Sequence, residues 1–408
     1  MRVGRLAMKL IERPHYLKQL ISVRDTPDIK VITGIRRSGK SKLMASFIEW
    51  LACNEPDAHV IDIDLTSLSF ESLREYHRLN AYVEAHYHPG KANYLFIDEV
   101  QNCTGLEIAI NSLHASEKYR IFITGSNAFL LSSDLATLFT GRAIEIEVYP
   151  FSFWEFMAYF AYPDIQEALD SYIIYGGMSG GYVYSEPSER FKYIQSVWNT
   201  LILRDIKQKY KLRNVNGIER ISEFMLDNIS NLSSSRNIAS TLSSAQNSIT
   251  YRTVQSYMNY LCNAFAFYKF RRYDVRGKKY LANHEKYYLC DHAFKYAKLG
   301  IKNLDFGRTL ENIVAIELLR RGYEVYVGVL YKTEIDFVAI RRDEKIYIQV
   351  AEDVSQPETL LREITPLLKV HDAYPRMVIA RTRHPVTLYE GIPIWDAAQW
   401  LLDLTDGR

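Results

Sequence analysis

Eight residues near the start of the chain have the types and the spacing that bind phosphate groups. Gly34 to Ser41 reads G-x-x-x-x-G-K-S, follows a short apolar strand pattern and precedes helical periodicity at 43–51. In such a loop, successive backbone N–H groups converge on phosphate oxygens, and the start of the helix adds partial positive charge. Lys40 is placed to reach the terminal phosphates, and Ser41 is placed to ligate Mg²⁺. The loop therefore predicts a site for a nucleoside triphosphate with its magnesium ion.

Two further cations lie inside this loop, at Arg36 and Arg37. They can attract the nucleotide or meet acidic side chains on an adjoining subunit, because hydrogen bonds between charged groups are the stronger ones. Together with the glycines, the serines and the lysine, they make up the expected nucleotide contacts. These residues are Gly34, Arg36, Arg37, Ser38, Gly39, Lys40 and Ser41.

An acidic pair follows the apolar run at 94–97, where the sequence continues with Asp98 and Glu99. A buried parallel strand would deliver Asp98 at its carboxyl end, where the carboxylate can hold the Mg²⁺ shell through water. Glu99 can orient or deprotonate an attacking water molecule. The pair therefore extends the prediction from nucleotide binding to hydrolysis.

The elements around these motifs alternate between strands and helices. Alternating or apolar patterns predict further strands at 59–65, 120–124 and 143–148. Strands that alternate with helices at this spacing indicate an α/β fold with a parallel sheet and helices on both faces. Ser126 and Asn127 follow the 120–124 strand. We expect a polar side chain there to lie beside the terminal phosphate, between the two motif strands.

The composition describes a globular chain. Its length of 408 residues indicates two to three domains. The hydrophobic fraction of 48% is high enough for these domains to form hydrophobic cores. A formal net charge of +2 means that any nucleic-acid surface would have to be local. The four cysteines form no C-x-x-C pair, so we expect neither a zinc site nor a disulfide framework. With no apolar run long enough to span a membrane and no signal-peptide core, we expect a cytoplasmic protein without a membrane partner.

The order of the motifs resembles the AAA+ ATPases, in particular the prokaryotic AAA_14 group whose C-terminal part is the domain of unknown function DUF4143. The shared features are the phosphate loop, the Asp-Glu strand, Thr-Gly-Ser-Asn after the next strand, Gly141-Arg142, and Pro-Phe-Ser-Phe-Trp-Glu-Phe at 150–156. The resemblance covers essentially the whole chain. It implies ATP and Mg²⁺ as cofactors and a sensor residue at Asn127 or Ser126.

Two arginines receive roles from the same resemblance. Arg142 corresponds to the finger that reaches the nucleotide of a neighbouring subunit, which implies a homo-oligomer. The alternative is a surface arginine that extends beside its strand. Arg204, within Leu-Arg-Asp-Ile at 203–206, is a candidate second sensor, and an ordinary intrahelical ion pair is the alternative.

The sequence divides into four expected domains. The ATPase core spans 1–150, and a helical lid spans 151–215. A winged-helix domain follows at 216–293, and a restriction-endonuclease-like α/β domain follows at 294–408.

The expected winged-helix domain carries a local basic surface. Its third helix, which begins at Tyr251, and the tip of its hairpin combine cations with aromatic and amide groups, a composition that tracks phosphates. Docking on the lid or on a neighbour, or simple solvation of these charges, is the alternative. The candidate nucleic-acid contacts are Tyr251, Arg252, Gln255, Arg271, Arg272, Arg276, Lys278 and Lys279.

The last expected domain resembles the PD-(D/E)XK nucleases. Glu311 on a helix, and Asp336 and Gln349 on adjacent strands, match the metal-binding framework of that fold. The lysine expected two residues after Gln349 is Ala351, and that lysine normally orients or activates the nucleophilic water. We therefore expect an inactive nuclease site, whose acids could hold a metal or merely cap the sheet.

Three functional hypotheses follow. The first is an oligomeric ATPase that couples ATP turnover to recognition of nucleic acid, with DNA the expected form. The second is an ATP-dependent nuclease of a defence or mobile-element system. The third is a nucleotide-switched protein scaffold that binds no nucleic acid.

Overall fold

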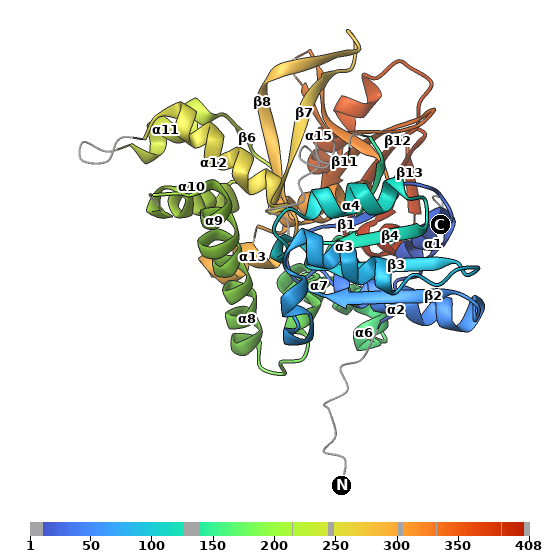
Figure 1. Ribbon diagram of the computed structural model, residues 1–408. Helices are drawn as coiled ribbons and strands as arrows, with labels where there is room; N and C mark the ends of the chain where they lie inside the picture. The colour runs from blue at the N-terminus through green and yellow to red at the C-terminus, as the bar shows by residue number, and fades with distance from the viewer. Residues whose placement is uncertain are drawn as a thin grey trace. The chain divides into compact units, whose positions relative to one another are not determined.

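The structure is a computed structural model that describes residues 11–125, 139, 141–213, 215–243, 249–300, 305–331, 333–384 and 386–403, apart from the side chains of 281–284. The chain forms two compact units (Figure 1). The first unit comprises Met1–Pro150 with Arg204–Lys211, and the second comprises Phe151–Leu203 with Leu212–Arg408. Each unit is described by itself. The division into four domains stays a prediction.

A five-stranded, wholly parallel sheet forms the centre of the first unit, as the sequence predicts. The strands lie in the order β2-β3-β4-β1-β5. Because β4 lies between β3 and β1, the two motif strands flank the strand that ends at Thr124. The strands are β1 (Ile29–Thr33), β2 (His59–Asp64), β3 (Asn93–Asp98), β4 (Tyr119–Thr124) and β5 (Ala143–Glu147).

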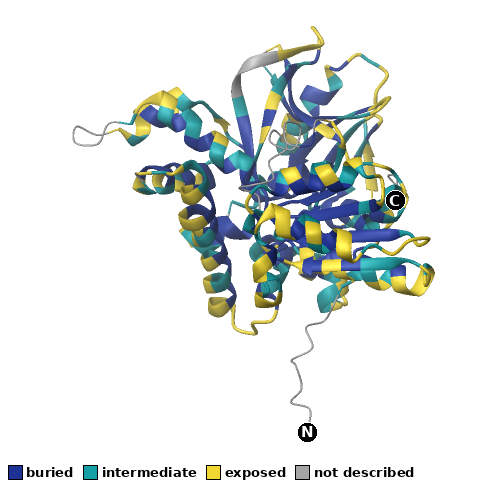
Figure 2. Cartoon of the chain, viewed as in Figure 1, coloured by how far each residue is buried: buried dark blue, intermediate teal, exposed yellow. Residues whose placement is uncertain are grey.

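Helices cover both faces of this sheet, because successive strand residues point to opposite sides. On one face, aliphatic strand residues such as Ile97 and Ile123 join Leu79 and Ile110 of two helices in a single core. On the other face, Phe47 packs against aromatic strand residues. The burial of the strands is visible in Figure 2. The helices are α1 (Pro14–Val23), α2 (Lys40–Asn54), η1 (Leu68–Leu73), α3 (Tyr76–Ala85), η2 (Val100–Asn102) and α4 (Leu106–Ala115).

Helices lead into the second unit. A π-helical segment, η4 (Leu201–Ile206), continues α8 and leads into α9 (Lys207–Tyr210). The remaining helices before the large sheet are α6 (Phe153–Phe160), α7 (Ile165–Tyr175), η3 (Ser179–Gly181), α8 (Pro187–Thr200), α10 (Val215–Asp227), α11 (Ser235–Leu242) and α12 (Tyr251–Asn263). Ser234 and Thr250 cap α11 and α12 with their hydroxyls, because such side chains satisfy the free N–H groups of a first turn.

One nine-stranded mixed sheet organises the rest of the second unit, in the order β13-β14-β12-β11-β10-β9-β7-β8-β6. The expected winged-helix hairpin, β7 with β8, belongs to this sheet because β7 pairs with β9. The strands expected in two domains are therefore hydrogen-bonded to one another. The strands are β6 (Leu232–Ser233), β7 (Phe267–Asp274), β8 (Lys279–Leu289), β9 (Glu324–Leu330), β10 (Thr333–Arg341), β11 (Glu344–Ala351), β12 (Arg376–Ala380), β13 (Val386–Tyr389) and β14 (Ile392–Asp396).

Four helices accompany these strands: α13 (Ala293–Leu299), α14 (Phe306–Arg320), α15 (Pro357–Leu368) and α16 (Ala397–Leu402). Residues Ile364 and Leu367 of α15 share a core with Val338 and Val378 of the sheet. Within the described part of the chain, no helix is long and apolar enough to cross a membrane.

Candidate functional site

The phosphate loop joins β1 to α2 and depends on its two glycines. Gly34 has a φ of +125°, and a Cβ built on it would lie 2.2 Å from the carbonyl oxygen of Val148. Gly39 has a φ of +98° and precedes the first residue of α2. Because side chains are strained in this backbone region, the loop requires glycine at both positions. Because α2 begins directly after Gly39, the free N–H groups of its first turn lie at the loop, where they can bind phosphate oxygens.

Lys40 is folded into the loop. Its side chain is enclosed, with 6% of the residue exposed, and Nζ donates to the carbonyl oxygens of Gly34 at 2.8 Å and Ile35 at 3.0 Å. Burial lowers the pKa of Lys40 to about 8, and the nearby Glu99 and Asp98 carboxylates oppose that shift. The ammonium therefore lies between loop carbonyls and the acidic pair.

The acidic pair lies at the carboxyl end of β3, as the sequence predicts. Thr124 of β4 donates its hydroxyl to Asp98 Oδ1, and the Glu99 N–H donates to the same oxygen at 3.1 Å. Burial raises the pKa of Asp98, while hydrogen bonds from Thr124 and Ser41 lower it. The two expected magnesium ligands, Ser41 and Asp98, are therefore brought together.

Glu99 has a left-handed backbone, with a φ of +55°. Non-glycine residues in this region carry strain and occur often at functional sites. Its N–H lies 3.3 Å from Thr124 Oγ1, and its side chain accepts a hydrogen bond from Gln101. The backbone at Glu99 is thus held by β4, next to the predicted position of the terminal phosphate.

Asp205 is a site residue that sequence reasoning missed. It lies in η4, has 8% of its surface exposed, and pairs with Nη1 of Arg36 at 3.5 Å. Burial raises the pKa of Asp205, and the guanidinium groups of Arg36 and Arg204 lower it. Arg204, the candidate second sensor, has an exposed side chain. The segment Arg204–Lys211 belongs to the first compact unit, so this ion pair connects η4 to the phosphate loop.

Arg13 was also missed, and it supports the loop from the N-terminal side. It is 6% exposed, and its guanidinium donates to the carbonyl oxygens of Ser38 at 3.0 Å and Tyr149 at 2.9 Å. The ring of Tyr16 lies 4.4 Å from the guanidinium carbon. Both partners are backbone carbonyl oxygens, and they lie 25 and 136 residues away in the sequence. No local sequence motif therefore identifies this arginine.

The loop residues fit a nucleotide with magnesium. The hydroxyl of Ser38 is buried and has no hydrogen-bond partner among the described residues. Buried polar groups in native proteins are nearly always satisfied, so an orphaned hydroxyl in this loop is suited to a ligand. Lys40 supplies the cation for phosphates, while Ser41 and Asp98 supply the oxygen ligands that Mg²⁺ prefers. Arg36 is half-buried and Arg37 is exposed, with a φ of +67°.

Arg142 lies at the amino-terminal end of β5, whereas the phosphate loop lies at the carboxyl end of the neighbouring strand β1. It is exposed and directly precedes β5, whose register pairs Ala143 with Ile29 and Glu147 with Thr33. The phosphate loop follows Thr33, so the length of the strand, about 16 Å at 3.3 Å per residue, separates Arg142 from it. This separation exceeds the length of an arginine side chain. Ser126 and Asn127, the expected sensor residues, lie outside the described residues.

The expected nucleic-acid residues lie on α12 and on the β7–β8 hairpin. All eight have exposed or half-buried side chains, and aromatic rings lie beside three of the arginines. Arg252 lies over the ring of Tyr251 at 5.9 Å, and Arg271 lies over the ring of Tyr280 at 5.5 Å. Arg272 is half-buried, and its Nε atom is buried without a hydrogen-bond partner among the described residues. The exposed members are Tyr251, Arg252, Arg271, Arg276, Lys278 and Lys279, and Gln255 is half-buried.

The structure also brings together the three residues of the expected nuclease-like site. The Asp336 N–H donates to Gln349 Oε1 at 3.3 Å, and a fourth residue, Lys286, links Asp336 to Glu311 of α14. Lys286 lies on β8, in the part of the chain expected to form the winged-helix domain. Ala351, where the resemblance implies a lysine, is buried. A lysine therefore enters the cluster from another strand, and only the tertiary structure reveals it.

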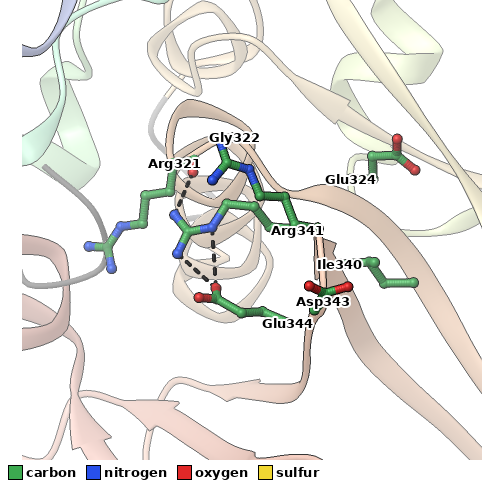
Figure 3. Close-up of a pocket in the computed structure, with 8 residues that line it drawn as sticks. Arg321, Gly322, Glu324, Ile340, Arg341, Asp343 and Glu344 are labelled. Atoms are coloured by element: carbon green, nitrogen blue, oxygen red, sulfur yellow. Dashed lines mark hydrogen bonds and ion pairs between the residues drawn. The ribbon is translucent and has the colours of Figure 1, made fainter. Parts of the chain in front are cut away.

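A separate hollow of about 850 Å³ in the second unit contains charges of both signs (Figure 3). Arg341 donates to Glu344 Oε2 at 2.8 Å and to the carbonyl oxygen of Arg321 at 3.0 Å. Its guanidinium is therefore engaged within the hollow. The lining residues are Arg321, Gly322, Glu324, Ile340, Arg341, Arg342, Asp343 and Glu344.

Comparisons with known proteins place these features in a family. The family model AAA_14, described as an AAA domain, matches residues 26–157. DUF8612, a domain of unknown function, matches residues 166–305, whereas the resemblance had implied DUF4143. An uncharacterized protein of Haemophilus influenzae is 34% identical over 404 residues, which cover 97% of this chain and 100% of that protein. The uncharacterized protein MJ1544 of Methanocaldococcus jannaschii is 24% identical over 371 residues, which cover 86% and 80%.

Solved structures give weaker matches. AMPPCP-bound DnaA from Aquifex aeolicus is 14% identical, with a TM-score of 0.29, over 60% of this chain and 84% of that chain. Cdc6p from Pyrobaculum aerophilum is 10% identical, with a TM-score of 0.31, over 77% of this chain and 97% of that chain.

Proposed function

Because the chain belongs to the AAA_14 family of AAA+ P-loop ATPases, we propose that it binds ATP with Mg²⁺ and hydrolyses the terminal phosphate. The observation that carries this proposal is the convergence of Lys40 and Ser41 of the loop with Asp98 and Glu99 at the carboxyl end of β3. Electrostatic stabilisation and positioning supply most of the catalysis in phosphoryl transfer, and these side chains are the parts it requires.

In this proposal each side chain has a defined task. Lys40 exchanges the carbonyl oxygens of Gly34 and Ile35 for phosphate oxygens, since both compete for the same ammonium. Ser41 and Asp98 would hold Mg²⁺, which when bound would neutralise charge on the terminal phosphates. Glu99 orients the attacking water and accepts its proton, with its backbone fixed against Thr124.

Phosphate release from ATP, measured on the purified chain with and without Mg²⁺, tests this proposal. We expect Lys40→Ala to abolish ATP binding, and Glu99→Gln to slow turnover by about 10²–10⁴-fold while ATP binding is retained. Lys42→Ala is a matched control, because Lys42 is an exposed neighbour on the same helix. Turnover that is independent of Mg²⁺, or unchanged in Glu99→Gln, would contradict the proposal.

Arg142 acts in this account as a finger for a neighbouring subunit, so the active form is a homo-oligomer. The position of Arg142 supports this role, since the length of β5 separates it from the phosphate loop of its own chain. The expected sensor role of Asn127 or Ser126 and the second-sensor role of Arg204 belong to the same proposal.

Recognition of nucleic acid is the proposed use of the second unit. The exposed cations of the hairpin tip support it, because Asp274, the one acid within residues 271–279, accepts hydrogen bonds from the N–H groups of Arg276 and Gly277 in the turn. DNA is the expected form, and the cytoplasm is the expected compartment. If the chain is a protein scaffold that binds no nucleic acid, we expect no salt-dependent retention of DNA or RNA. If it is a nuclease, we expect cleavage of DNA that Asp336→Ala abolishes.

A further inference from the structure

A buried lysine lies among the acids of the nuclease-like cluster. Lys286 has 4% of its surface exposed. Its Nζ lies 2.8 Å from Glu334 Oε1, 3.0 Å from Glu311 Oε1 and 3.8 Å from Asp336 Oδ1. Glu311 comes from α14, while Glu334 and Asp336 come from β10. One ammonium thus bridges carboxylates from a helix and from a strand other than its own.

Other donors of the chain occupy the neighbouring oxygens. Tyr288 donates its hydroxyl to Glu311 Oε1 at 2.7 Å, and the Val350 N–H donates to Asp336 Oδ2 at 2.9 Å. Gln349 accepts from the Asp336 N–H and donates to Glu363 Oε2 at 3.1 Å. Two of the oxygens that a cation could use, Glu311 Oε1 and Asp336 Oδ2, are therefore already hydrogen-bonded within the chain.

The distances exclude joint occupancy by a metal ion. Mg²⁺ requires oxygens at about 2.0–2.1 Å in near-octahedral geometry. An ion that close to Glu311 Oε1 and Glu334 Oε1 would lie where Nζ now lies, and like charges would repel. Within the described part of the chain, no three acidic, histidine or cysteine side chains are arranged to hold a metal ion.

The charge state agrees with this geometry. The neighbouring carboxylates raise the pKa of Lys286 above its ordinary value despite the opposing effect of burial, so the ammonium is charged. Burial raises the pKa of both Asp336 and Glu311, and the ammonium counteracts that rise. A buried charge whose partner is removed is strongly destabilising, so Lys286 is essential to the cluster.

We infer that the ammonium of Lys286 takes the place of a divalent cation in this cluster, so that the nuclease-like site binds no metal and cleaves no phosphodiester bond. A site without a metal ion explains both the absence of the nuclease lysine at Ala351 and the presence of Lys286 among the acids. The cluster is an internal ion-pair network that joins β8, β10 and α14, and the second unit is a metal-independent module.

The opposing possibility is a catalytic lysine that moves aside when a metal enters. The two ideas predict different metal binding by the native cluster. In the first, only a chain without the ammonium binds a divalent ion. In the second, the native cluster binds the ion through Asp336, and Lys286 releases its carboxylates.

Mn²⁺ binding to the full-length, nucleotide-free chain separates them, read by electron paramagnetic resonance. Asp98→Asn is present in every sample to remove the predicted magnesium ligand of the ATPase site. We expect no Mn²⁺ binding that depends on Asp336 in this parent. Adding Lys286→Ala should create one site per chain, and adding Asp336→Asn to that variant should remove it. Lys269→Ala, which changes an exposed lysine on the neighbouring strand β7, should behave as the parent.

Mn²⁺ binding by the parent that Asp336→Asn abolishes would overturn the inference, and this comparison needs no Lys286 variant to fold. Thermal unfolding gives a second measurement. Mn²⁺ should raise the melting temperature of the Lys286→Ala chain and leave that of the parent unchanged. An equal increase in both would also overturn the inference.

Discussion

Arg13 offers a prediction whose magnitude follows from the structure. Its guanidinium donates two buried hydrogen bonds, to the carbonyl oxygens of Ser38 and Tyr149. Hydrogen bonds that involve a charged group contribute about 1.5–3 kcal/mol each, so both together contribute about 3–6 kcal/mol. In Arg13→Met, water can replace part of the two hydrogen bonds that the carbonyl oxygens of Ser38 and Tyr149 lose. We therefore expect the free energy of unfolding of the first unit to fall by about 3 kcal/mol.

This loss should be visible in thermal unfolding and in nucleotide binding. For a unit of this size, 1 kcal/mol corresponds to about 2–4 °C, so the first transition should fall by about 6–12 °C. Because Ser38 lies within the phosphate loop, affinity for a non-hydrolysable ATP analogue should fall as well. Arg13→Lys, which keeps a charge and can still donate to one carbonyl, should lose less of both.

Lys18→Met is the matched control, since Lys18 lies on α1, the helix that begins directly after Arg13, with an exposed side chain. It should leave the transition and the affinity unchanged. A melting temperature within about 2 °C of the parent in Arg13→Met would refute the reasoning, because that shift corresponds to less than about 1 kcal/mol.

Four further predictions follow from the same structure. Gly34→Ala should abolish ATP-analogue binding in calorimetry, because its Cβ would lie 2.2 Å from a backbone oxygen; retained affinity would contradict the loop geometry. Affinity should decrease as the pH rises through about 8, since the Lys40 ammonium, whose pKa burial lowers, is charged below that pH and neutral above it; an affinity that does not change with pH across this range would contradict the role of the ammonium. Arg142→Ala and Lys40→Ala chains, each inactive alone, should regain ATPase activity when mixed, because one supplies the intact site and the other the finger; no recovery would argue against action between subunits. Reversing the charge of Arg276 and Lys278 should weaken DNA binding and flatten its salt dependence in fluorescence anisotropy, whereas an unchanged slope would favour the scaffold alternative.

Much of the first unit could be predicted from the sequence because its signals are local. The phosphate loop requires glycines at fixed positions within eight residues, and Asp98 with Glu99 directly follows an apolar strand. The parallel sheet then follows from the alternation of strands and helices, and the observed order brings the two motifs to one edge. The local sequence signals and the observed sheet agree here, so the prediction of a parallel α/β fold is confirmed.

The residues that were missed act across long sequence separations. Arg13 bonds to a carbonyl 136 residues away, and Asp205 pairs with Arg36 across 169 residues. Lys286 reaches Glu311 from a strand that the periodicity assigned to a different domain. Periodicity describes which face a residue occupies but not which distant element covers that face, so only the fold could reveal these three contacts.

The most direct test of the account is the identity of the nucleotide that the chain retains. The native chain and Glu99→Gln are incubated with ATP and Mg²⁺, separated from free nucleotide, and the bound nucleotide is analysed by chromatography. We expect ADP on the native chain and ATP on Glu99→Gln, because Glu99 acts in hydrolysis and not in binding. ATP retained unchanged on the native chain, or ADP on both, would contradict this expectation.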